Sequence, residues 1–220
     1  MMYVKGAYVI IVFFIMSMVG YTITYTYFTF HYSDRLYHAC HLSNKLGKDA
    51  LKMAIEGKNK CCHFSDILTI IDYSLPSSSK RFIVLDLRHE KLLSHTYVAH
   101  GKNSGELYAT QFSNENESKM SSLGFYKTGE TYCGKHGYSL RLHGLEDGVN
   151  DLAYLRNIVI HPADYVSESY LKQYGRLGRS HGCPALPVNE SRAIIDQIKG
   201  GTCLFIYSKD KGYKYQSVII

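Results

Sequence analysis

Residues 81–99 read RFIVLDLRHEKLLSHTYVA. The runs 81–87 and 92–99 are rich in apolar and β-branched residues, and the polar residues 88–91 lie between them. Two such runs joined by a short polar link are typical of a β-hairpin. Further short strands are predicted downstream, at residues 124–128, 138–143, 157–161 and 202–207.

Two helices are predicted at the margins of this β region. Residues 45–57 carry apolar side chains at helical spacing, and Gly57 is expected to end that helix. Asn189 is predicted to cap the start of a second helix, which the glycine pair 200–201 ends. One or two helical turns are expected within residues 147–155. The sequence therefore predicts one mostly β (α+β) unit with short peripheral helices.

The composition is that of a globular protein. The chain has 220 residues, of which 45% are hydrophobic, enough for one ordinary domain with a packed core. The formal net charge of +6 is dispersed, without a dense run of Lys or Arg. A nucleic-acid-binding surface requires clustered basic residues, so no nucleic-acid partner is predicted.

The N-terminal segment is expected to lie outside the fold. Residues 7–19 form an uncharged apolar run after Lys5, which suits an export signal. With residues 20–23 the run approaches the ~20 residues that span a bilayer. Residues 1–23 are therefore predicted to be a cleaved signal peptide or a signal anchor, the latter holding the protein in the inner membrane through residues 7–23. Both alternatives predict export to the periplasm or cell envelope.

The segment with the most chemical information is RSHGCPALP, residues 179–187. Gly182 permits a tight turn, so that neighbouring backbone N–H groups can converge beside Cys183. Such N–H groups form an oxyanion hole when a thiolate attacks a carbonyl. Because a free Cys has a pKa near ~8.5, a neighbouring imidazole is needed to generate the thiolate. Pro184 and Pro187 stiffen the exit from the turn.

Two histidines are candidates for the base. His181 lies two residues before Cys183, on the same side of an extended chain. His161 ends the predicted strand 157–161, where a side chain can reach the mouth of a pocket. A Cys beside Gly and Pro is by itself more often structural. The order of His161, a gap of 18 residues and then Ser-His-Gly-Cys at residues 180–183 is far more specific.

This order resembles the L,D-transpeptidase (YkuD-type) catalytic domain, whose signature is a His, a variable gap and then Ser/Thr-His-Gly-Cys. The chain is similar to a divergent branch of this murein family over residues 67–207, with weaker likeness back to about residue 45. The segments that carry the resemblance are HGKNSG (100–105), FSN (112–114), SSLGFY (121–126), GKHG (134–137), SLRL (139–142), VIH (159–161) and GRS (178–180).

The resemblance implies a fold and a set of roles. The fold is a mixed β-sandwich or barrel of the L,D-transpeptidase type, with the Cys on a loop. Cys183 would be the nucleophile and His161 its general base, and Ser180 would help to hold the imidazole and the loop. The backbone N–H groups of Cys183, Gly182 and His181 would receive the oxyanion. The resemblance implies neither a cofactor nor a metal.

The implied substrate is the peptide stem of peptidoglycan. The thiolate would attack the bond after the third residue of a tetrapeptide stem, D-Ala would leave, and the acyl group would pass to an amine. On this interpretation residues 24–44 are a linker, residues 45–66 a short helical lead-in, and residues 67–220 the catalytic domain.

Two departures from the family pattern leave the acceptor open. The family commonly has Arg or Asn shortly after the Cys, whereas residues 184–186 are Pro-Ala-Leu here, and Pro162 follows His161 where Gly is frequent. One alternative is hydrolysis of the same bond by an L,D-carboxypeptidase or amidase. Another is a catalytically silent wall-binding protein of the same fold. A papain-like peptidase is disfavoured because there the Cys precedes the His.

Several other residues are weaker site candidates. Arg141 and Arg179 could bind a stem-peptide carboxylate, and a structural ion pair is an equally favoured role for each. Tyr126 and Tyr165 could form pocket walls, although core packing is favoured for both. His136 and His143 adjoin glycines and are expected in loops, as is His100. The weaker candidates for substrate binding are Arg141, Arg179, His100, Tyr126 and Tyr165.

The remaining cysteines do not form a recognisable pattern. If Cys183 stays a free thiol, five remain, and an odd number cannot all pair within the chain. These are Cys40, Cys61, Cys62, Cys133 and Cys203. Residues 61–63, Cys-Cys-His, lack the spaced second half of a zinc site, so a structural role is favoured and no metal site is predicted.

Overall fold

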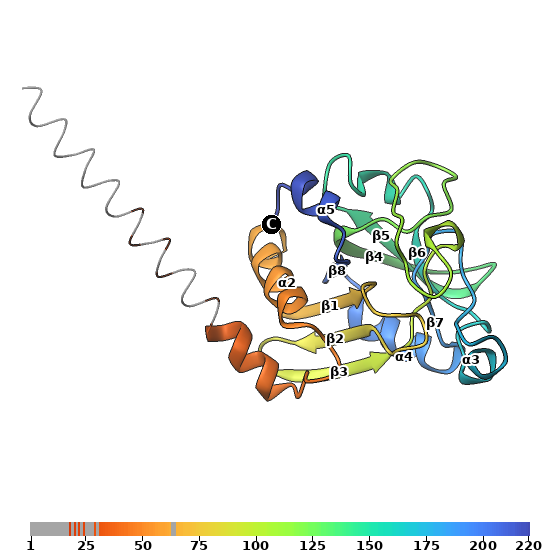
Figure 1. Cartoon of the computed structure of the whole chain (residues 1–220), viewed down its shortest axis with the longest axis horizontal. Helices are drawn as coiled ribbons and strands as arrows, with labels where there is room; N and C mark the ends of the chain where they lie inside the picture. Colours follow the sequence, from red (N-terminus) through yellow and green to blue (C-terminus); the bar gives the residue numbers. More distant parts are fainter. Residues whose placement is uncertain are drawn as a thin grey trace, which may run out of the picture.

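The computed structural model describes residues 18, 20, 22, 24, 29, 31–62 and 65–220. Its centre is an eight-stranded mixed sheet in the order β3-β2-β1-β8-β4-β5-β6-β7 (Figure 1). The strands are β1 (Ile67–Asp72), β2 (Phe82–Asp86), β3 (Lys91–Thr96), β4 (Gly124–Gly134), β5 (Gly137–Gly144), β6 (Val159–Pro162), β7 (Ala185–Leu186) and β8 (Cys203–Tyr207).

The two ends of the strand order meet. Beyond β3, Ala99 exchanges backbone hydrogen bonds with Ala185 of β7, at 2.9 and 3.4 Å. The sheet is therefore nearly closed into a barrel, which leaves few strand edges unpaired. The mostly β class predicted from the sequence is confirmed, as is the hairpin of β2 and β3 within residues 81–99.

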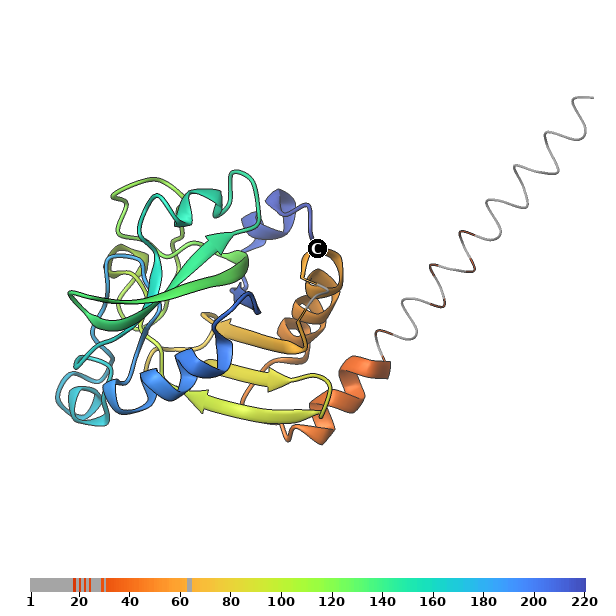
Figure 2. The ribbon, with the colours of Figure 1, turned by 180° about the vertical axis from the view of Figure 1, so that it is seen from behind.

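Short helices surround the sheet, also as predicted. They are α2 (Lys48–Cys61), α3 (Glu168–Tyr174), α4 (Val188–Ile198) and α5 (Lys211–Gln216), with 3-10 turns at Lys102–Ser104 and Asp151–Ala153. Figure 2 shows α4 running across the strands on the side turned away from the viewer in Figure 1. The cap of α4 is Pro187 rather than the predicted Asn189, which lies within the first turn.

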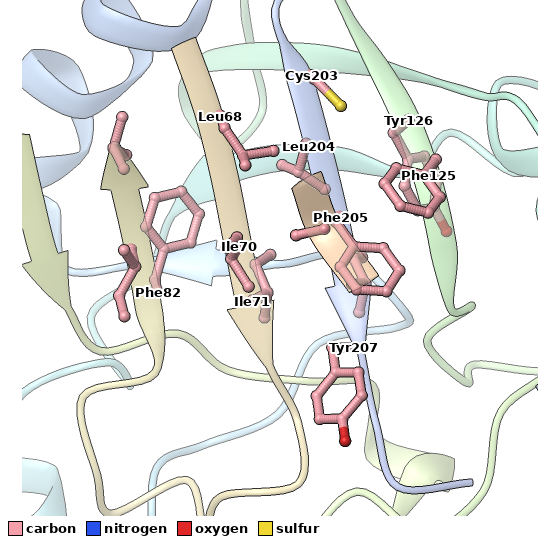
Figure 3. Packing of buried hydrophobic residues seen from close by; sticks show 14 of the residues in the cluster. Leu68, Ile70, Ile71, Phe82, Phe125, Tyr126, Cys203, Leu204, Phe205 and Tyr207 are labelled. Carbon is pink, nitrogen blue, oxygen red and sulfur yellow. The ribbon is translucent and has the colours of Figure 1, made fainter. Parts of the chain in front are cut away.

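The central strands are buried on both faces. Every residue of β8 is buried, and the ring of Phe205 stacks on that of Phe125 from β4 with centroids 4.2 Å apart. Figure 3 shows these side chains between the strands, with Cys203 further along β8. Burial on both faces explains why β1 and β8 read as continuous apolar runs.

The prediction that Gly57 ends the first helix is wrong. The helix α2 continues four residues further, to Cys61. A Cβ atom at Gly57 would lie 2.0 Å from the Phe125 ring, so this glycine serves the close approach of α2 to the sheet. Glycine in a helix usually weakens it, but a packing requirement overrides propensity here.

Two other segments differ from the expectation. The predicted strand 138–143 agrees with β5. The predicted strand 124–128 is only the first part of β4, which continues to Gly134, so that β4 and β5 form a long hairpin. Residues 31–39, within the predicted linker 24–44, are helical, and the Leu36 and Leu42 side chains are fully buried in the core.

Within the described residues, no helix is both long and apolar enough to cross a bilayer. The predicted signal peptide or anchor, residues 1–23, lies mostly outside the described part of the chain.

Candidate active site

The fold brings Cys183 and His161 to neighbouring strands. β6 and β7 run parallel, with His161 opposite Ala185, two residues after Cys183. Because side chains alternate along a strand, His161 points away from the face on which Ile160 is buried in the core. Cys183 therefore lies on the loop that enters β7, close to the strand that carries the imidazole.

The turn at Cys183 is fixed by hydroxyl groups. Ser180 Oγ donates to the carbonyl O of Cys183 at 2.6 Å and accepts from the backbone N–H of Gly182 at 3.0 Å. Ser121 Oγ donates to the Gly182 carbonyl at 3.1 Å. Gly182 has φ = 123°, and a Cβ atom there would lie 2.8 Å from the Met120 carbonyl O, so only glycine fits.

These bonds refine two expectations. Ser180 holds the loop, and its described hydrogen bonds do not include one to the imidazole of His161. The Gly182 N–H is occupied by Ser180, which leaves it unavailable to an oxyanion. Within the described part of the chain, no protein group accepts a hydrogen bond from the backbone N–H of Cys183 or His181. Those two N–H groups are the remaining oxyanion donors.

The imidazole of His161 is arranged as a neutral base. Only 4% of the residue is exposed, and Nδ1 lies 2.9 Å from the Pro162 carbonyl O. Because a carbonyl can only accept, Nδ1 carries the proton and the lone pair is on Nε2. Burial lowers the His161 pKa, the bond to Pro162 raises it, and His136 lowers it further. The lowered pKa keeps the ring neutral near pH 7.

The Cys183 thiol is in its resting, protonated state. Its side chain is partly exposed, and Sγ donates to the Asn157 carbonyl O at 3.6 Å. Burial raises the Cys183 pKa, whereas a backbone hydrogen bond from Val159 and the charge of Arg156 lower it. The described hydrogen bonds include none between Cys183 and His161, so the thiol must turn from Asn157 before it can transfer its proton.

Arg156 is a site residue for which the sequence carries no motif. Its guanidinium donates to the Ser113 and Met120 carbonyls, both at 2.7 Å, and to Ser122 Oγ at 2.6 Å. These bonds tie the loop of residues 113–122 to the short segment before β6. Arg156 thus holds the loop that carries Met120 against the Cys183 turn, and its positive charge favours the thiolate.

The turn of the β4–β5 hairpin reaches the site. His136 is exposed, and its ring lies against that of His161 with centroids 4.7 Å apart at 32°. The sequence predicted His136 in a loop, as observed, but could not show that a hairpin folds this loop back over the base. His181 is also exposed, and its pKa is lowered by partial desolvation and by the charges of Lys102 and Lys119.

The weaker candidates do not all reach the site. His100 and Tyr126 are fully buried, and Tyr126 packs in the core. His100 Nδ1 accepts from the guanidinium of Arg81 at 2.7 Å, and Nε2 donates to the Gly105 carbonyl at 3.1 Å. Both ring nitrogens are therefore occupied in supporting the loop. Tyr165 is half-buried near Cys183, and its pKa is raised by burial and by the thiolate charge.

Both candidate arginines form ion pairs. Arg179 Nη1 lies 2.6 Å from Glu106, and Arg141 Nε lies 3.0 Å from Glu130. Both arginines therefore make structural ion pairs, which is the role that was weighed against substrate binding. His143 also approaches the Glu130 carboxylate, at 3.8 Å. The prediction that His143 lies in a loop is wrong, because it is part of β5 and pairs with Lys127 of β4.

A groove lies just past the ends of β6, which carries His161, and β7, which follows Cys183. Its volume is 630 Å³, and its lining includes Ala163, two residues after His161, and Pro187, four residues after Cys183. At about 3.3 Å per strand residue, Pro187 lies roughly 13 Å along the chain from Cys183. The charged side chains in the lining are Lys80, Asp164, Glu168 and Glu190.

Within residues 31–62 and 65–220, together with the few described residues before them, no group of His, Cys, Asp and Glu side chains has the arrangement of a metal site.

Comparisons with known proteins place this arrangement in a family. The L,D-transpeptidase catalytic domain matches residues 40–207. No curated protein matched the sequence. Among solved structures the chain is similar to an L,D-transpeptidase from Mycobacterium smegmatis, with 14% identity and a TM-score of 0.39 over 64% of this chain and 58% of that one.

Two further structures are similar at the same level. They are an L,D-transpeptidase from Stackebrandtia nassauensis (15% identity, TM-score 0.39, 75% of this chain and 67% of that one) and the helical cell shape determining protein Pgp2 from Campylobacter jejuni (13%, 0.41, 66% and 48%). The chain thus spans less than two thirds of the Mycobacterium and Campylobacter structures. Because the family match covers most of the 220 residues, this protein belongs to the L,D-transpeptidase catalytic domain family.

Proposed function

We propose that this protein is an exported cysteine L,D-transpeptidase that acts on peptidoglycan stem peptides. The family implies peptidoglycan cross-linking, and a cell-wall enzyme family suggests an extracytoplasmic location. The observation that carries the proposal is the neutral His161, with Nε2 free to accept a proton, on the strand beside the Cys183 turn.

The proposed reaction begins with proton transfer from Cys183 Sγ to His161 Nε2. The thiolate attacks the carbonyl carbon of the third stem residue, and the backbone N–H groups of Cys183 and His181 stabilise the oxyanion. The C–N bond then breaks, and the imidazolium gives its proton to the D-Ala nitrogen. An amine attacks the thioester in turn, which forms the new amide and restores the thiol.

The surroundings support the acyl transfer in two ways. The backbone hydrogen bond from Val159 and the charge of Arg156 favour the thiolate, against the burial that raises the pKa of Cys183. The groove lined by Ala163 and Pro187, which follow His161 and Cys183 in the chain, offers space for a part of the stem peptide beyond the reacting bond. For residues 1–23 we propose export by a signal peptide or a signal anchor, with residues 67–220 as the catalytic domain.

Mass spectrometry of muropeptides tests the proposal. Purified protein is incubated with tetrapeptide muropeptides, and we expect loss of D-Ala together with cross-linked dimers. Cys183→Ala and His161→Ala should abolish both products. Cys133→Ala is the matched control, because that thiol is exposed on the hairpin and takes no part in the reaction.

The products also separate the alternatives. Loss of D-Ala without dimers, with several amine acceptors supplied, would assign hydrolysis of the same bond. No Cys183-dependent product would contradict an enzymatic role and favour a silent wall-binding protein.

A further inference from the structure

Three cysteines outside the candidate active site lie together. Cys61 and Cys62 end the helix α2, and Cys203 begins the strand β8. The two sulfur atoms of Cys61 and Cys62 are 3.5 Å apart, and the Cys203 thiol lies close enough to both for each to raise its pKa. The sequence gives no reason to connect them, because Cys203 lies more than a hundred residues beyond the vicinal pair.

The packing of α2 on the sheet explains why these thiols meet. Gly57 of α2 contacts the Phe125 ring, which in turn stacks on Phe205. Cys61 follows Gly57 by four residues, so it lies on the same face of the helix. Cys203 precedes Phe205 by two residues, so it lies on the same face of the sheet. Cys61 and Cys203 therefore face each other across the interface between helix and sheet.

The three thiols differ in access and in ionisation. Cys62 and Cys203 are fully buried, whereas Cys61 is partly exposed. Hydrogen bonds from Cys203 and Cys61 lower the pKa of Cys62, and the charges of Lys58 and Lys127 lower it further. Hydrogen bonding and burial raise the pKa of Cys203. Cys61 is thus the thiol that an external reagent reaches. The hydrogen bond with Cys203 lowers the pKa of Cys61, but the Cys62 thiol and burial raise it to about 12, so attack by Cys61 is slow.

We propose that Cys61 and Cys203 form a disulfide when the protein meets a small-molecule or protein disulfide. Cys61 attacks the donor, forms a mixed disulfide and releases one donor thiol. Cys203 then attacks the Cys61 sulfur, and its proton leaves with the second donor sulfur, which is released as a thiol. The two cysteines lose two electrons, and the donor disulfide gains them. Disulfide donors are present in extracytoplasmic compartments.

The bond ties α2 to the sheet and does not involve the catalytic thiol. It closes a loop of most of the domain, and a loop of this length is expected to stabilise the fold. One internal pair leaves Cys40, Cys62 and Cys133 reduced alongside Cys183. The proposal does not rest on the proposed enzymatic function.

The test uses the full chain with Cys183→Ala, incubated with glutathione disulfide. The protein is then denatured, and its free thiols are alkylated and counted by intact mass. We expect two of the five remaining thiols to be protected, and a peptide that links residues 61–80 to the peptide containing Cys203. The unfolding midpoint should fall when a reductant is added.

Variants in the same background identify the partner. Cys62→Ser is the matched control: the link should still form, because Cys62 takes no part in it. Cys61→Ser and Cys203→Ala should each abolish it. A circular dichroism spectrum equal to that of the parent shows that each variant is folded. The proposal is overturned by a link that survives Cys61→Ser, by a vicinal Cys61–Cys62 bond, or by full alkylation of the folded parent.

Discussion

Replacing Ser180 by Ala tests the structure of the catalytic turn. The Ser180 hydroxyl makes two of the three side-chain bonds that shape this turn, to the carbonyl of Cys183 and from the N–H of Gly182. Only 5% of Ser180 is exposed. Alanine removes the two bonds without adding volume, so the effect reports on the bonds alone.

The size of the effect follows from the groups left without partners. A buried polar group without a hydrogen bond costs ~1–3 kcal/mol. The Cys183 carbonyl is only partly buried and can regain a bond to water, so we expect the free energy of unfolding to fall by about 2 kcal/mol. A displacement of ~1 Å at a reacting atom lowers rates by roughly 10²-fold, and we expect kcat to fall by about that factor.

The assays are denaturant unfolding, D-Ala release and the rate of iodoacetamide alkylation of Cys183. Ser180→Thr is the matched control, because it keeps the hydroxyl and should retain most of the activity. A Ser180→Ala enzyme with kcat within about twofold of the wild type would refute the role of this hydroxyl, as would a Thr variant that is equally impaired.

Three further predictions concern other contacts. His136→Ala removes a ring and a charge that both lower the His161 pKa, so the acidic limb of the kcat/KM profile should move to higher pH. In urea titrations, Gly57→Ala should lower the free energy of unfolding by about 1–3 kcal/mol through overpacking against Phe125. Gly47 has open space around it, so the control Gly47→Ala should change the free energy of unfolding by less than about 0.5 kcal/mol. The pKa of buried His100 is lowered to about 4, so the unfolded state binds more protons. Stability should therefore fall by about 2 kcal/mol from pH 7 to pH 4.5, and a His100→Gln variant should show a flatter pH dependence; an unchanged slope would contradict this assignment.

The strand pattern of the sequence predicts much of the fold. The two apolar runs within residues 81–99 are joined by a short polar link, and the hairpin of β2 and β3 is found there. The helical spacing of Ile194, Ile195 and Ile198 in α4 is likewise a local pattern, and these three residues are buried. Local patterns could not predict that Gly57 faces Phe125, because that contact joins segments far apart in the chain.

The same limit applies to the site. The Cys183 turn and His161 are visible in the sequence because the signature keeps the His before a contiguous Ser-His-Gly-Cys run. Arg156 and His136 reach the site through a loop and a long hairpin, and no short motif records such contacts. Tyr126 lies within a family-like segment, and its side chain packs in the core, which is the role favoured for it from the sequence.

The central claim is that the Cys183 thiol forms an acyl-enzyme with the help of His161. The most direct measurement is the intact mass of the protein after brief exposure to a tetrapeptide muropeptide without an amine acceptor. We predict an adduct equal to the substrate minus D-Ala, located on the peptide that contains Cys183. The adduct should be absent from Cys183→Ala and form much more slowly in His161→Ala. No adduct on the wild-type protein, or an adduct that persists in Cys183→Ala, would contradict the account.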